Sequence, residues 1–101
     1  MNTPVTVSTG RSADGQVVVT AIGELDMTNV DEFSRALDDA LRQTDGDPVD
    51  VDLRRVEYLD SGAINTLFPH AERVRVIANP ILMPVLTISG LAQAASVEAG
   101  G

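Results

Sequence analysis

The segment from Val49 to Phe68 constrains the fold more than any other part of the chain. Its first residues alternate between apolar and charged side chains, from Val49 to Arg54, which is the period of a strand with one buried face. Asp60 and Ser61 follow, and either can cap a helix because its side-chain oxygen can accept a hydrogen bond from an unpaired backbone N–H. Apolar residues at helical spacing come next. We therefore predict a strand, a short turn and a helix, with a hydroxyl displayed where the helix begins.

A hydroxyl at the start of a helix has several possible roles. It can act as a nucleophile, the helix start can hold an anion, or the hydroxyl can be phosphorylated. A plain capping residue is the commoner case. From the local pattern alone, a capping role and a functional role for Ser61 both remain open.

Length and composition limit the domain organisation. The 101 residues are enough for one small domain, residues 1–101, with a single core. Apolar residues make up 44% of the chain but aromatic residues only 3%, so the core must consist mainly of Val, Leu, Ile and Ala. The net charge of −8 would repel nucleic-acid phosphates and attract a basic protein. We expect a protein partner and no direct contact with nucleic acid.

Other features of the sequence limit where the chain works and which ligands it holds. It contains no cysteine, so disulfides, thiolate catalysis and cysteine-ligated metals are excluded. The N-terminal residues, Met1 to Val5, have neither a basic region nor a long apolar run, and no apolar run is long enough to span a membrane. We expect a cytoplasmic monomer or weak dimer that needs no cofactor or metal.

The N-terminal half predicts two strands and a helix. Val5 and Val7 belong to a first strand, and the Asp14-Gly15 pair suits a tight hairpin turn. A second strand follows from Val17, and we expect Gly23 to end it and residues 24–27 to form a loop. A capping box at residues 28–31, with Thr28 as the cap, then begins a helix. The buried stripe of this helix is predicted to be Val30, Phe33, Ala36, Leu37, Ala40 and Leu41.

The C-terminal half predicts a further strand and helix after the segment described first. Pro69 is expected to end the second helix because proline removes a donor and clashes with the preceding turn. A strand over residues 74–78 comes next, and Asn79-Pro80 begins an apolar helix that Gly90 closes in a left-handed conformation. The tail holds at most a short edge strand. The order β-β-α-β-α-β-α predicts an α/β fold with a mixed sheet of four to five strands and helices packed on one face.

Three short motifs coincide with these elements. Residues 23–26 (Gly-Glu-Leu-Asp) follow the second strand, residues 53–61 run out of the third and end in Asp60-Ser61, and residues 89–91 (Ser-Gly-Leu) follow the last helix. In this order the chain resembles the STAS domain from about Val5 to Val97. It is most similar to the single-domain anti-sigma factor antagonists of bacteria.

The resemblance implies a partner-switching function. The unphosphorylated antagonist would bind an anti-sigma factor, which is also a serine kinase of the histidine-kinase-like ATPase fold, and would thereby free a sigma factor. Phosphorylation of Ser61 would release the partner, and a phosphatase would restore binding. The partner-binding surface implied by the family consists of Glu24, Asp26, Thr28, Asp60, Ser61, Gly62 and Asn65.

The sequence departs from the family pattern after Ser61. Gly62 and Ala63 stand where members usually carry Ser-Gly, and Asn65 replaces a usual glycine. The segment from Ser61 to Pro80 is also shorter than in the family by roughly seven residues, about two helical turns. The shortened helix would offer less surface to a partner.

Other functions fit the sequence less well. An enzyme would need a base for Ser61, and the only histidine, His70, should lie at the far end of the short helix. Asp50, Asp52 and Asp60 could bind a cation, but a solvated face is the better interpretation. Within the STAS family, a non-phosphorylated subunit that binds the ATPase of a lipid transporter, or a component of a signalling assembly, is the main alternative.

Overall fold

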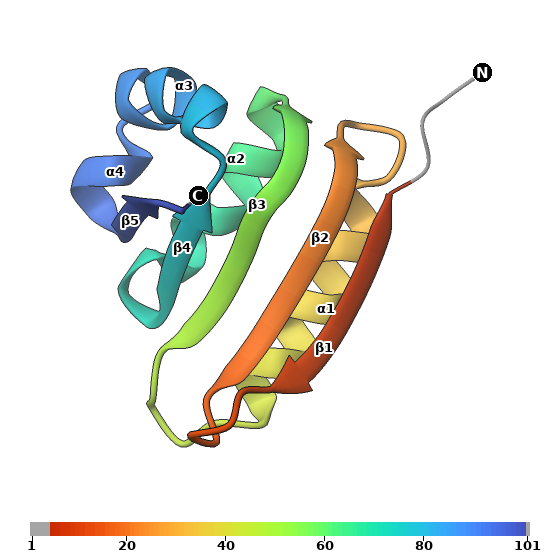
Figure 1. Cartoon of the computed structure of the whole chain (residues 1–101), viewed down its shortest axis with the longest axis vertical. Coiled ribbons are helices and arrows are strands. Elements are labelled where there is room, and N and C mark those ends of the chain that lie inside the picture. Colours follow the sequence, from red (N-terminus) through yellow and green to blue (C-terminus); the bar gives the residue numbers. More distant parts are fainter. Residues whose placement is uncertain (1–4, 101) are drawn as a thin grey trace.

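The computed structural model of the protein describes residues 5–100, so most of the N-terminal stretch from Met1 to Val5 lies outside the described residues. The strands form one sheet in the order β1-β2-β3-β4-β5 (Figure 1). Their bounds are β1 Thr6–Arg11, β2 Val17–Leu25, β3 Val49–Leu59, β4 Val74–Ala78 and β5 Ser96–Ala99. β1 is antiparallel to β2, and the other neighbouring strands are parallel. The predicted α/β fold with a mixed sheet is confirmed.

The prediction that Gly23 ends the second strand is wrong. Gly23 has a φ of 113° and lies at a shift in the register between β2 and β3, so it forms a bulge inside the strand. Glycine allows this because the left-handed region costs it little. β2 therefore continues to Leu25, which is buried opposite Leu59 of β3. Glu24 and Leu25, which were expected in the loop, belong to the strand.

The predicted first helix is confirmed as α1, Val30–Arg42, and it covers β2 on one face of the sheet (Figure 1). Four residues of its predicted stripe are fully or almost fully buried, and the other two are partly buried against the core; the buried four are Phe33, Leu37, Ala40 and Leu41. The predicted capping box is wrong, because the helix begins one residue later with Asn29 as N-cap. The Asn29 side chain makes no cap bond. It donates instead to the Glu24 carbonyl at 2.8 Å and accepts from the Asp26 N–H at 3.0 Å.

The second helix is α2, Ser61–Leu67, packed behind β3 (Figure 1). The α-helix ends before Pro69 as predicted, but the chain continues in 3-10 turns as η1, Phe68–Arg73. Because proline has no N–H to donate, the regular α-helical pattern cannot pass through it, whereas a tighter turn can begin there. α2 itself is only seven residues long.

The C-terminal part differs most from its prediction. The single helix expected after Asn79 is divided into η2, Pro80–Leu82, and α3, Met83–Ile88, because Pro84 lies in the first turn of the second piece. The Asn79 side chain caps η2 by accepting from the Ile81 N–H at 3.1 Å, and Gly90 has the expected left-handed φ of 89°. A short α4, Leu91–Ala94, which was not predicted, precedes the edge strand β5. No helix within residues 5–100 is long and apolar enough to cross a membrane.

Candidate functional site

The candidate site lies where β2 and β3 end side by side. The strands are parallel, with Leu25 opposite Leu59, and the Asp60 N–H donates to the Leu25 carbonyl at 3.2 Å. The loop that carries Asp26 and the turn that carries Asp60 therefore leave the sheet at the same edge. The structure brings together two motifs that are 34 residues apart in the sequence.

The start of α2 decides between the two possible caps. Asp60 has extended backbone angles, and its carboxylate Oδ1 accepts from the Ala63 N–H at 3.0 Å, so Asp60 is the N-cap. Ser61 is the first residue of the helix and is exposed. Among residues 5–100, no hydrogen bond involves the Ser61 hydroxyl. The helix start is thus capped without any contribution from Ser61.

Asp26 is held in the loop after β2 by its neighbours. Its Oδ1 accepts from the Thr28 hydroxyl at 2.5 Å and from the Thr28 N–H at 2.9 Å. These bonds lower the pKa of Asp26 from its usual value of 3.8, and the bond from the Thr28 hydroxyl has the larger effect. The carboxylate is therefore charged at neutral pH, and its orientation is fixed on the same edge of the sheet as Ser61.

Met27 is a member of this surface that sequence reasoning did not single out. Its side chain is 81% exposed, and its Cγ would lie 3.7 Å from a Cβ placed on Gly62. The same Cβ would lie only 3.3 Å from Oδ1 of the capping Asp60. Gly62 therefore leaves room both for the cap and for the approach of the β2–α1 loop. An apolar residue between acidic and polar neighbours was the only signal in the sequence.

The remaining predicted residues lie on the same two segments. Asn65 is exposed one turn after Ser61, so the two share a face of α2. Thr28 is exposed, whereas Glu24 is half-buried near the end of β2. The structure thus places the seven residues of the predicted surface at one edge of the sheet, and their role in binding stays a prediction.

His70, Asp50 and Asp52, which could serve a catalytic or cation-binding site, lie away from this edge, whereas Asp60 is part of it. His70 lies in η1, with its Nε2 3.7 Å from Oδ1 of Asp38 on α1. Asp50 accepts two bonds from Arg75, at 2.8 and 2.9 Å, and Asp52 is paired in the same way with Arg54, at 3.0 and 2.8 Å. These strand carboxylates are thus matched by arginines on the sheet face. Within the part of the chain that the structure describes, no three acidic or histidine side chains gather as metal ligands would.

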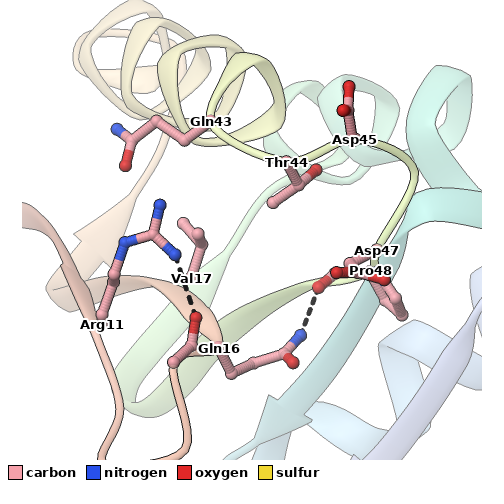
Figure 2. A pocket seen from close by; sticks show the side chains of 9 residues that line it. Arg11, Gln16, Val17, Gln43, Thr44, Asp45, Asp47 and Pro48 are labelled. Atoms are coloured by element: carbon pink, nitrogen blue, oxygen red, sulfur yellow. Dashed lines mark hydrogen bonds between the residues drawn. The ribbon is translucent and has the colours of Figure 1, made fainter.

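A small hollow of about 110 Å³ lies at the opposite end of the sheet, between the β1–β2 hairpin and the segment that joins α1 to β3 (Figure 2). Arg11 donates to the Gly15 carbonyl at 3.0 Å, and the Gln16 amide donates to the Pro48 carbonyl. These bonds join the hairpin to itself and to the start of β3. None of the predicted site residues lines this hollow.

Residues 8–97 match the family model described as "Mlab, STAS domain", which spans most of the chain. The chain therefore belongs to the STAS domain family, as the sequence motifs predicted. Comparison with curated protein sequences finds no match.

Solved structures show the same fold over nearly the whole chain. An anti-sigma factor antagonist from Mycobacterium paratuberculosis has a TM-score of 0.83 at 22% identity, covering 94% of this chain and 86% of its own. The anti-sigma factor antagonist SpoIIAA in its unphosphorylated form has a TM-score of 0.64 at 20% identity, covering 95% and 89%. An uncharacterized protein from Shewanella loihica with a SpoIIAA-like fold has a TM-score of 0.61 at 15% identity, covering 99% and 88%.

Proposed function

We propose that the chain is an anti-sigma factor antagonist that is switched off by phosphorylation of Ser61. In its unphosphorylated form it binds an anti-sigma factor through the edge that carries Asp26, Asp60 and Ser61. The anti-sigma factor is a serine kinase of the histidine-kinase-like ATPase fold, and a phosphatase reverses the modification. The proposal is supported by STAS family membership and by the fold shared with two structures of anti-sigma factor antagonists.

The observation that carries the proposal is that Asp60, and not Ser61, caps α2. Asp60 caps α2, whereas the Ser61 hydroxyl is exposed at the first helical position. A kinase can therefore reach this hydroxyl, and modifying it removes no hydrogen bond on which the helix depends. A switch at this position changes what the domain binds without changing how it folds.

The expected effect of phosphorylation is electrostatic. The γ-phosphoryl group of ATP is transferred to Ser61 Oγ, ADP leaves, and the hydroxyl proton passes to a base of the kinase. The phosphate adds about −1.5 to −2 charges. In the free protein this charge stays in water. In a complex it would have to be desolvated next to the carboxylates of Asp26 and Asp60, which raises the free energy of the bound state.

We infer that the chain acts by binding and not by catalysis. A nucleophilic Ser61 would need a base within hydrogen-bond reach. His70 faces Asp38 of α1 instead, on a different element from Ser61. By freeing a sigma factor in the cytoplasm, the chain regulates transcription, and it does so by binding a protein and not nucleic acid.

The test uses purified anti-sigma factor kinases of the source organism. Each is incubated with ATP and either the wild type or Ser61→Ala, and intact mass is measured. One added phosphoryl group on the wild type and none on Ser61→Ala is the expected result. Binding of the same kinase should be weakened about tenfold or more by Ser61→Asp, while the melting temperature stays within a few degrees.

Two results would contradict the proposal. Phosphorylation that persists in Ser61→Ala would place the modification elsewhere. A stable complex with the ATPase of a lipid transporter that Ser61→Asp leaves intact, together with no binding to any of the kinases, would assign the chain to the alternative role of a transporter subunit.

A further inference from the structure

The segment from Val76 to Val97 contains no charged residue, although 22% of the chain is charged. Within it, three large apolar side chains are exposed: Ile81 by 62%, Val85 by 37% and Ile88 by 86%. Their spacing of four and three residues places them on one face of the η2–α3 segment. Leu82 and Leu86 supply the buried side. We call Ile81, Val85 and Ile88 the α3 stripe.

The η2–α3 segment lies at the same end of the molecule as the start of α2, although β4 ends opposite Leu53, six residues before the last residue of β3. η2 follows the end of β4, which is parallel to β3, and the Asn79 N–H donates to the Leu53 carbonyl of β3 at 3.3 Å. Figure 1 shows η2 and α3 at the end of the molecule where α2 begins. At the other end of α3, Gly90 lies close to the ring of Phe68, just beyond α2. The C-terminal end of α3 therefore lies near the C-terminal end of α2.

The exposed apolar side chains lie toward this end of the molecule. Besides the α3 stripe, the large apolar residues exposed within residues 5–100 are Met27 and Tyr58. Met27 lies against the start of α2, and Tyr58 is the penultimate residue of β3. Single exposed apolar residues are ordinary on a protein surface, but a group of them at one edge is typical of an interaction surface.

The charges beside the α3 stripe indicate what covers it. Asp26 and Asp60 lie at the same edge, and the chain carries a net charge of −8. A second copy would bring the same carboxylates together, and an anionic lipid surface would repel them. A protein with an apolar patch flanked by basic side chains is complementary to both parts of the surface.

We propose that the α3 stripe is the apolar half of the interface with the anti-sigma factor, a proposal that rests on the proposed function. The seven-residue α2 offers little surface, and the α3 stripe supplies the apolar contact area beside it. The region around Ser61 supplies the charge that controls binding. The interface thus has an apolar part that gives affinity and an acidic part through which phosphorylation acts.

The experiment measures the affinity of the purified anti-sigma factor for the wild type, Ile81→Ser, Ile88→Ser, Ser61→Asp and Asp26→Asn at low and high salt. Ile81→Ser and Ile88→Ser should each weaken binding about tenfold and leave its salt dependence unchanged, because they remove apolar area and no charge. Asp26→Asn should instead reduce the salt dependence. Thr87→Ser, an exposed substitution on the same helix, is the matched control and should bind as the wild type does. Thermal melting of each variant checks the fold.

The outcomes separate this inference from the proposed function. If Ile81→Ser and Ile88→Ser bind normally while Ser61→Asp does not, the α3 stripe is overturned and the phosphorylation switch stands. If the two serine variants bind weakly while Ser61→Asp binds normally, the α3 stripe is supported and the switch is overturned. If no anti-sigma factor binds the wild type, both fall.

Two further measurements test other occupants of the surface. A wild-type dimer in light scattering that Ile88→Ser dissociates would show that a second copy covers the α3 stripe. Sedimentation with phosphatidylglycerol vesicles that Ile88→Ser abolishes would show that a lipid surface does. Either result would overturn the inference.

Discussion

Replacing Asp60 and Ser61 separately tests the structural basis of the proposed switch. The structure predicts that Asp60→Ala destabilises the protein and that Ser61→Ala does not. Asp60 accepts from the Ala63 N–H at 3.0 Å, whereas the Ser61 hydroxyl is exposed and makes no hydrogen bond among residues 5–100. The two neighbours carry similar short oxygen-bearing side chains, so the comparison isolates which one caps α2.

The magnitude follows from the loss of one cap. Replacing an N-cap aspartate by alanine costs about 1 kcal/mol, with a range of about 0.5 to 2. For a domain of this size, a loss of 1 kcal/mol lowers the melting temperature by about 4 to 8 °C. An exposed substitution such as Ser61→Ala should stay within about 0.5 kcal/mol of the wild type.

The assay is urea unfolding followed by circular dichroism, with thermal melting as a second measurement. Asp60→Asn is the control, because it keeps a side-chain oxygen that can accept from Ala63 and should retain most of the stability. If Ser61→Ala were as destabilising as Asp60→Ala, the serine hydroxyl would be part of the cap. Phosphorylation would then disturb the fold, and the reasoning behind the switch would be refuted.

Three other predictions concern the site and the core. Because hydrogen bonds from Thr28 lower the pKa of Asp26 below its usual value of 3.8, the ionised carboxylate stabilises the fold above that pH. This stabilisation is lost as the pH falls through the lowered pKa that Asp26 has in the folded protein. The difference in melting temperature between the wild type and Asp26→Asn should therefore be largest at neutral pH and should shrink below pH 3.8. A difference that does not change with pH would contradict this prediction. Gly62→Ala should gain about 1 kcal/mol of helix propensity, but its Cβ would lie 3.3 Å from Oδ1 of Asp60. The full gain should therefore appear only in the Asp60→Ala background, which a double-mutant cycle in urea unfolding would measure. Phe33→Ala empties a fully buried position and should cost about 3 to 5 kcal/mol in urea unfolding; a loss below about 1 kcal/mol would mean that α1 does not pack through this residue.

The first strand-turn-helix segment could be predicted well because its signals are local. The alternation from Val49 to Leu53 specifies the buried face of a strand within a few residues. Asp60 begins the helix because its carboxylate accepts a hydrogen bond from the first turn, and Pro69 ends it because proline has no N–H to donate. The same holds for α1, where helical spacing alone identifies the buried face.

Predictions failed where contacts that form only in the folded chain decide the outcome. Gly23 is a bulge and not a strand end, because β3 continues beside it and pairs with Glu24 and Leu25. Asn29 replaces Thr28 as N-cap because the Thr28 hydroxyl already donates to the Asp26 carboxylate, and the Asn29 amide donates to the Glu24 carbonyl. The choice between Asp60 and Ser61 as cap also depended on the folded turn and could not be made from residue types.

By itself, the sequence determined the family, the type of fold and the two segments that form the candidate site, since periodicity and short motifs are properties of neighbouring residues. Tertiary structure alone decided that Asp60 caps α2 and leaves the Ser61 hydroxyl exposed, and that Met27 and the α3 stripe are exposed. The spacing of Ile81, Val85 and Ile88 is compatible with either a buried or an exposed helix face. Which of the two holds is decided by the elements that pack against the helix, and in this fold they cover Leu82 and Leu86 instead.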